Sequence, residues 1–260
     1  MTTTPTPLDP AVRLGLRKLN GVAAVLHGAQ AIAVVALATA FALPVTATYM
    51  TGAPSPTVGH QRVVLFHVSF PLLIAAFFSL SALAHLVVAA PGEARYAHQL
   101  SLGRNPYRWV EYSLSSSLMI VAIAMLTGIS DVTALVALIG VNASMIAFGW
   151  IQERYEAPGA GLGPFWLGCG AGIVPWVGIG IYLIGPGASQ GPPGFVYGIY
   201  VSLFLFFNCF ALNQWLQYRA MGPWRSYLFG ERTYLVLSLV AKSLLAWQIF
   251  ASTLASSAAH

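Results

Sequence analysis

Charge is scarce in this chain. Only 7% of its 260 residues are charged, whereas 57% are hydrophobic, and the mean hydropathy is +0.73. Roughly 25% of the residues in a soluble domain are charged. Because so little charge cannot cover a water-facing surface of this size, most of the surface must face lipid. The composition therefore predicts an integral membrane protein, and we expect no enzymatic activity.

Basic clusters and a cleavable signal are also lacking, and the chain has only two cysteines. Lys and Arg (12) outnumber Asp and Glu (7), but the basic residues stand singly between apolar runs, so we expect no nucleic acid partner. Cys169 and Cys209 lie inside apolar runs, which favours small packing residues over a disulfide or a metal pair, and no metal is expected. Residues 1–12 are polar and lack a cleavage site. They predict a disordered tail before one membrane domain, residues 13–260.

Long apolar runs are what the chain has in abundance. A bilayer core of roughly 30 Å needs about 20 helical residues. Only helices and closed barrels satisfy their backbone groups in lipid, and the runs show no period-2 alternation. The sequence therefore predicts an all-α bundle of seven transmembrane helices. The runs cover approximately residues 21–50, 61–90, 105–128, 131–151, 164–185, 195–218 and 231–256.

The distribution of basic residues predicts the orientation of this bundle. Basic residues are enriched on the cytoplasmic side of a membrane protein. Arg62 stands alone on one side, so the sequence predicts a cytoplasmic amino terminus and an extracellular carboxy terminus in a multi-pass protein of the cell membrane. The basic residues of the other side are Arg13, Arg17, Lys18, Arg95, Arg104, Arg108, Arg154, Arg219, Arg225 and Arg232.

Lys242 and Glu111 lie inside predicted spans, where ionisable groups are costly and usually functional. Counted from Arg232 and Arg104, they lie about 15 Å and about 10 Å deep, a difference that a Lys side chain can cover. Ser238 and Ser115 lie one helical turn away and can bond this pair or pack between helices. The pair is either a structural ion pair, or the desolvated amine forms a Schiff base.

Three histidines also fall in predicted spans. His27 and His85 map to the cytoplasmic half, with Ser81 one turn from His85, and they favour a hydrated polar cavity over packing histidines. His67 maps to the external half of the second span, and we interpret it as structural. The external half is otherwise apolar apart from hydroxyls and Gln248. The polar groups therefore stop near the middle of the bundle, whereas an ion path would need them from face to face.

The segment Arg108–Ser117 (RWVEYSLSSS), the cytoplasmic amino terminus and Ser238 followed by Lys242 resemble the heliorhodopsins, which are inverted relative to other microbial rhodopsins. The resemblance covers essentially the whole chain. It implies all-trans retinal held on Lys242 as a Schiff base with Glu111 as counterion. It also implies hydrogen bonding by Ser81 and Ser238, a cytoplasmic cavity at His27 and His85, and an external sheet that the short loop 51–59 would reduce. The remaining pocket residues that it implies are Ser115, Leu118, Met119, Ala122, Asn142, Trp166, Phe207 and Gln214.

The resulting prediction is a light-sensing photoreceptor with a protonated retinal Schiff base and no net ion transport. The resemblance implies a homodimer, which small residues at Gly168, Gly172, Gly178 and Gly180 also favour, although these can serve close packing within the chain. We expect a cytoplasmic signalling protein to bind the loops that connect spans 2 and 3, spans 4 and 5, and spans 6 and 7. Two alternatives stay open: a light-driven proton or ion transporter, and a seven-helix protein without chromophore.

Overall fold

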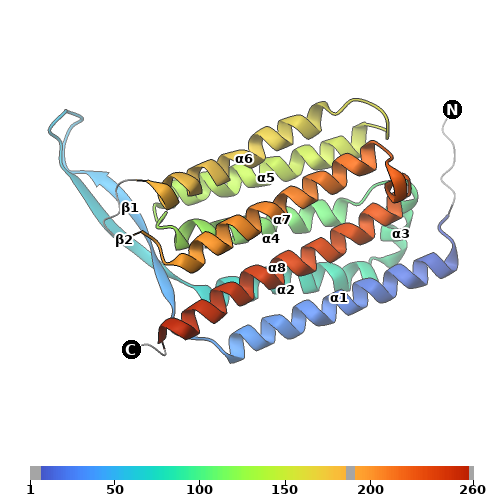
Figure 1. Ribbon diagram of the computed structural model, residues 1–260, viewed down its shortest axis with the longest axis horizontal. Coiled ribbons are helices and arrows are strands. Elements are labelled where there is room, and N and C mark those ends of the chain that lie inside the picture. Colours follow the sequence, from blue (N-terminus) through green and yellow to red (C-terminus); the bar gives the residue numbers. More distant parts are fainter. Residues whose placement is uncertain (1–6, 186–190, 258–260) are drawn as a thin grey trace.

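Seven long helices lie side by side in one bundle, and a two-stranded hairpin projects from one end of it (Figure 1). The computed structural model describes residues 7–185 and 191–257. Within these ranges seven helices are long and apolar enough to cross a membrane, which confirms the predicted seven-helix membrane bundle. They are α1 (Pro10–Ala36), α2 (Phe70–Ala89), α4 (Pro106–Leu126), α5 (Val132–Tyr155), α6 (Gly163–Ile184), α7 (Gly194–Tyr218) and α8 (Tyr227–Ser257).

The two ends of the bundle differ in what covers them (Figure 1). The short helix α3 (Glu93–Ser101) and the 3-10 helix η1 (Gly222–Arg225) lie at the end where α1 begins, which we call the N-terminal end. The strands β1 (Ala42–Met50) and β2 (His60–Ser69) lie at the opposite end, which we call the hairpin end. An ion pair of 2.6 Å between Arg13 and Glu93 joins α1 to α3.

Helix α1 begins earlier than the sequence predicted. Asp9 caps it by accepting a hydrogen bond of 2.7 Å from the backbone nitrogen of Ala11, and Pro10 takes the first helical position, which proline favours. Residues 10–12 are therefore helical, and the prediction of a disordered tail up to residue 12 is wrong for them. The predicted tail's residues 1–6 lie outside the described residues.

The hairpin corrects the first two predicted spans. The sequence predicts helix for residues 42–50 and 61–69, but these stretches pair as antiparallel strands, from Ala42 opposite Ser69 to Met50 opposite His60. Hydropathy alone cannot distinguish these strands from helices, whereas their content of Val, Thr, Tyr and Phe favours strands. The expectation of a reduced sheet is likewise wrong, because the short loop 51–59 is only the turn of a longer hairpin.

One edge of the hairpin is attached to the bundle, and the rest is exposed. Thr46 donates its backbone N–H to the carbonyl oxygen of Ser130 at 2.8 Å, and Arg62 donates to the Ser130 hydroxyl at 2.7 Å. Val45 and Ala47 are buried beside Thr46. His67 lies on exposed β2 rather than in a membrane span, because its segment extends from the bundle as a strand.

Helix α4 is the centre of the bundle. It is the most buried of the seven helices and packs against α2, α5, α6 and α7. Toward the hairpin end it buries apolar residues such as Ile120 and Ile123, whereas toward the N-terminal end it buries Arg108, Glu111 and Ser115. The buried charged side chains of the described residues are therefore gathered around one half of this central helix.

Candidate functional site

A buried lysine on α8 and a buried glutamate on α4 form the centre of the site. The Nζ atom of Lys242 lies 2.8 Å from Oε1 of Glu111 and 2.7 Å from the hydroxyl of Ser238. Lys242 and Glu111 are 3% and 8% exposed. Ser238 precedes Lys242 by one helical turn, which places both side chains on one face of α8. The pairing that was expected from sequence depth is thus present.

Glu111 is also held from α2. Ser81 donates its hydroxyl to Oε1 of Glu111 at 2.6 Å, so this oxygen accepts from both Ser81 and Lys242. The phenol ring of Tyr112 has its centre 5.3 Å from Lys242 Nζ. Three helices therefore fix the amine and its carboxylate partner, which restricts where the charge on Lys242 can be compensated.

An apolar cavity opens from Lys242 and Ser238. It contains about 820 Å³ of space free of protein atoms, including the open space at its mouth. We call it the apolar cavity. Its aromatic walls are Trp109, Tyr112, Phe165, Phe207, Phe210 and Tyr234, and Met119, Met145, Ile146, Gly149, Gly168, Cys169 and Gln214 also line it. A buried primary amine facing such walls is suited to a Schiff base with a long apolar aldehyde, so the residues present fit retinal.

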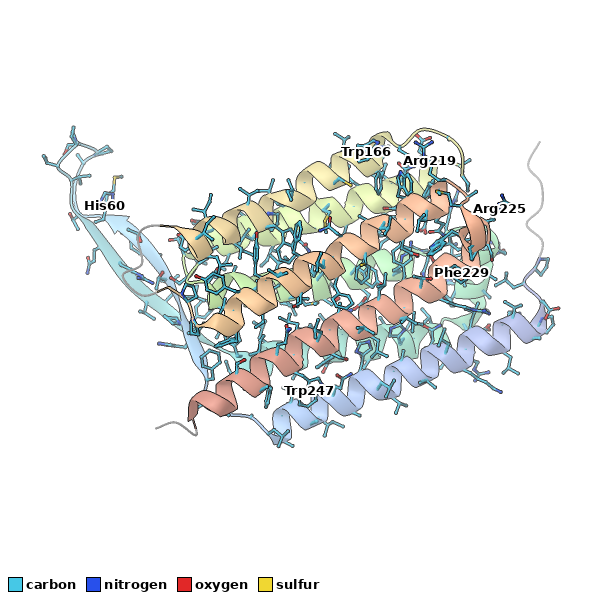
Figure 2. All side chains as sticks on the ribbon, viewed as in Figure 1. His60, Trp166, Arg219, Arg225, Phe229 and Trp247 are labelled. Carbon is cyan, nitrogen blue, oxygen red and sulfur yellow. The ribbon has the colours of Figure 1, made fainter. Side chains whose placement is uncertain are left out.

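Four of the pocket residues implied by the resemblance line this cavity, and four do not. Ser115, Met119, Phe207 and Gln214 are among its walls. Leu118 and Ala122 do not line it: Ala122 is fully buried in the apolar core, and Leu118 packs against that core. Trp166 is 60% exposed on the outer side of α6, and its neighbour Phe165 lines the cavity in its place (Figure 2). Successive helical residues point about 100° apart, so an error of one position in choosing the inner face exchanges a wall residue for a lipid-facing one.

Asn142 is the fourth exception. Its side chain is buried and donates to the hydroxyls of Ser116 at 2.7 Å and Ser117 at 3.1 Å. It therefore joins α5 to α4 behind the cavity wall and does not line the cavity itself. Ser116 is the member of this group that faces the cavity.

A second cavity, which we call the polar cavity, lies toward the N-terminal end. It contains about 430 Å³ of free space and includes Glu111, His85, Asn20, Arg108 and Glu231 among its walls. Nδ1 of His85 lies 2.8 Å from Oδ1 of Asn20. Glu111 thus stands between Lys242 on one side and the polar cavity on the other.

His27 does not line the polar cavity. Its fully buried ring stacks on that of His85 at 5.6 Å between centroids and 6° between planes, and it also contacts Phe78. Neither ring nitrogen of His27 has a hydrogen-bond partner among the described residues. We expected both histidines to line a polar cavity, but only His85 does so, and His27 is stacked behind it.

The sequence reasoning missed a buried ion cluster at the N-terminal end, formed by Arg108, Glu153 and Glu231. Arg108 was counted as a loop cation, but it is 7% exposed and pairs with Glu153 at 2.6 Å and with Glu231. Three of the seven acidic residues of the chain, Glu111 included, are thus buried. The signal was present, because Glu153 and Glu231 lie near the ends of predicted spans at a depth similar to Arg108. However, each glutamate is followed directly by an exposed arginine, Arg154 or Arg232, and this pattern is typical of a loop.

Comparisons with known proteins agree with the resemblance. Residues 16–254 match the family model described as Heliorhodopsin. No curated protein matches the chain significantly. Among solved structures, Acetabularia rhodopsin I superposes with a TM-score of 0.65 at 15% identity, covering 98% of this chain and 100% of that chain. The light-driven proton pump of Coccomyxa subellipsoidea gives 0.63 at 17% identity, covering 92% and 96%. The transmembrane domain of the Salpingoeca rosetta rhodopsin phosphodiesterase gives 0.61 at 12% identity, covering 95% and 90%. At such identities these likenesses show the fold alone.

Proposed function

The chain belongs to the heliorhodopsin family, and on that premise we propose that it is a light-sensing photoreceptor that moves no net ions across the membrane. As a family member it is a multi-pass membrane protein of the retinal rhodopsin type. We further propose that it lies in the cell membrane with its N-terminal end in the cytoplasm, where the basic residues favour it.

The observation that carries the proposal is the position of Lys242. Its amine is buried between Glu111 and Ser238 at the wall of the apolar cavity. We propose that Lys242 holds all-trans retinal as a protonated Schiff base. When bound, retinal supplies the absorption of visible light and the isomerisation that follows. The protein residues supply binding, orientation and the electrostatic environment.

Glu111 has two roles in this proposal. Its carboxylate compensates the positive charge on the Lys242 nitrogen, which a desolvated site requires, and the Ser81 hydroxyl fixes its orientation. Glu111 also borders the polar cavity, which His85 lines. A proton that leaves the Lys242 nitrogen therefore has a polar route toward the N-terminal end, to the group that His85 and His27 form, and it returns by the same route.

The absence of net transport is proposed because the polar route stops at the middle. Apart from Lys242 itself and His27, which stacks on His85 beside it, the hairpin-side halves of the seven described spans contain no Asp, Glu, Lys, Arg or His. His67, the one base that the sequence places in the external half of a span, lies instead on the exposed strand β2. An unpaired charge in that half would face a desolvation cost on the order of several kcal/mol. This cost opposes the passage of an ion from one face of the bundle to the other. Light would instead change the conformation of the N-terminal end, for a cytoplasmic signalling protein to read.

We also propose a homodimer. The glycines of α6 support it less than the sequence suggested, because two of them pack closely within the chain. A Cβ at Gly172 would lie 2.5 Å from Sδ of Met145, and one at Gly180 would lie 3.0 Å from the hydroxyl of Tyr200. These glycines therefore permit close packing within the chain, as the alternative interpretation held, whereas Gly178 has no such neighbour within 4 Å. Crosslinking in native membranes that yields only monomers would contradict the dimer.

Purification with all-trans retinal tests the photoreceptor proposal. We expect a visible absorption band that borohydride reduction abolishes while leaving the chromophore covalently bound to the protein. A protein without such a band would be a seven-helix protein without chromophore. Illumination of a cell suspension, with and without protonophore, tests transport. A sustained protonophore-sensitive pH change would replace the sensor with a light-driven transporter.

A further inference from the structure

Trp109 belongs both to the apolar cavity and to the surroundings of the buried ion cluster. Its indole ring is one wall of the apolar cavity and is 5% exposed. Its Nε1–H group donates to Oε2 of Glu153 at 2.6 Å. Hydrogen bonds from a neutral donor to a carboxylate are stronger than those between neutral groups. The cavity wall and the ion cluster are therefore joined directly through one side chain.

The indole has no free space toward α5. A Cβ placed on Gly149 would lie 2.7 Å from Cζ3 and 2.8 Å from Cη2 of Trp109, so the ring rests against the α5 backbone. The guanidinium carbon of Arg108 lies 4.3 Å from the centre of the Trp109 ring and 3.9 Å from that of Tyr234, another wall residue. Because close-packed groups transmit displacement rather than absorb it, pressure on Trp109 from the cavity must reach Arg108 or Glu153.

The ion cluster in turn joins three long helices, α4, α5 and α8, at the N-terminal end of the bundle. Glu153, near the end of α5, accepts from the backbone N–H of Asn105 at 2.8 Å and from the hydroxyl of Tyr227 at 3.0 Å. Glu231 on α8 accepts from the Asn105 side chain at 2.6 Å. Asn105 caps the start of α4, and Tyr227 is the first residue of α8, directly after η1 and Ser226. A shift of Glu153 therefore alters the attachment of α4 and α8 together.

We propose that Trp109 is a positioning residue that passes a change in the shape of the apolar cavity, through Glu153 and Arg108, to the starts of α4 and α8. The inference rests on the proposed function, because retinal is the occupant that would change the cavity under light. The inference names the two places at which a change in the shape of the apolar cavity would alter the structure of the N-terminal end: the segment 219–232 and the turn before α4. It also separates this route from the proton route, which runs from Lys242 past Glu111 into the polar cavity.

Hydrogen–deuterium exchange of the retinal-free protein tests the connection without any pigment. Trp109→Phe keeps an aromatic ring but removes the N–H donor to Glu153. We expect the backbone amides of residues 102–105 and 224–232 to exchange about tenfold faster, since a hydrogen bond to a charged group is lost. Trp166→Phe, which changes an exposed indole on α6, is the matched control and should leave both segments unchanged. Equal exchange in Trp109→Phe and the wild type would overturn the inference.

The second arm compares light and dark in protein loaded with retinal, normalised to the pigment present. We expect illumination to change exchange in residues 222–232 of the wild type, and Trp109→Phe to reduce that change severalfold. Glu153→Gln tests the same route without altering the cavity wall, and it should give the same reduction. A change of wild-type size in both variants would overturn the inference. If the wild type forms no visible band, the proposed function fails, and the retinal-free comparison alone decides the role of Trp109.

Discussion

The two halves of the bundle are built from the same seven helices but differ in the groups that they bury. The half near the hairpin end is a packed apolar core, with fully buried side chains such as Phe77, Ile123 and Leu245. The half near the N-terminal end buries Lys242, Glu111 and the Arg108, Glu153 and Glu231 cluster, together with a polar cavity. Buried charges add little net stability, so their confinement to one half indicates a function there and a structural role for the other half.

The comparison also shows why the site is one-sided. Lys242 lies near the middle of α8 and lines the apolar cavity, and its partner Glu111 lines the polar cavity toward the N-terminal end. Every charged partner that the structure gives this lysine or its carboxylate is therefore on one side.

Loss of the amine should have the largest effect. The chain has only two lysines, Lys18 and Lys242, and we expect Lys242→Ala to abolish the visible band completely, because no other buried amine can carry the chromophore. Lys18→Ala is the control and should keep the band. A pigment in Lys242→Ala that borohydride cannot fix to the protein would show that the attachment site is wrong.

Loss of the carboxylate should have the next largest effect. In Glu111→Gln the positive charge at Lys242 loses its neighbouring opposite charge, which disfavours the protonated form. We expect most of the pigment to absorb in the blue at neutral pH, unless chloride takes the place of the carboxylate. Glu156→Gln, at the end of α5, should keep the wild-type spectrum. A pH titration that matches the wild type would remove Glu111 from the role of counterion.

Two glycines on α5, one in each half of the bundle, allow the packing of the two halves to be compared on a single helix. A Cβ at Gly149 would meet the buried Trp109 ring, whereas one at Gly140, nearer the hairpin end, meets no atom within 4 Å. Overpacking costs about 1–3 kcal/mol, so Gly149→Ala should lower the thermal midpoint and reduce retinal uptake. Gly140→Ala should be neutral or stabilising by up to about 1 kcal/mol through helix propensity. Equal midpoints for the two variants would contradict the tight contact at Trp109.

The surface pair Arg13–Glu93 should have the smallest effect. The hydrogen bond from Arg13 holds the pKa of Glu93 below its usual value. A group whose pKa is lowered by folding stabilises the folded state above its unfolded pKa, and this contribution is lost as the pH falls through the folded value. We therefore expect Glu93→Gln to lower the melting temperature by about 2 °C or less at neutral pH, and by nothing below the folded pKa. A drop that persists in acid would point to a role other than this ion pair.

The amino-acid sequence by itself determined the membrane class, the seven spans and the central pair. Span length and hydropathy are local properties, so five of the seven helices could be placed within a few residues. The depths of Lys242 and Glu111 follow from counting from Arg232 and Arg104, and this count places the two groups within about 5 Å of one another in depth. Ser238 could be added because one helical turn fixes its face.

Only the tertiary structure decided which faces meet and which apolar stretches leave the bundle. The strands of the hairpin are as apolar as a helix end, and their pairing depends on a partner segment rather than on hydropathy. Phe165 rather than Trp166 lines the apolar cavity because the rotation of α6 is set by its packing against α5. Arg108 could be identified as a buried ion only once Glu153 and Glu231, 45 and 123 residues away in sequence, were seen beside it. Burial of a charge depends on partners distant in the chain, and local sequence does not encode their proximity.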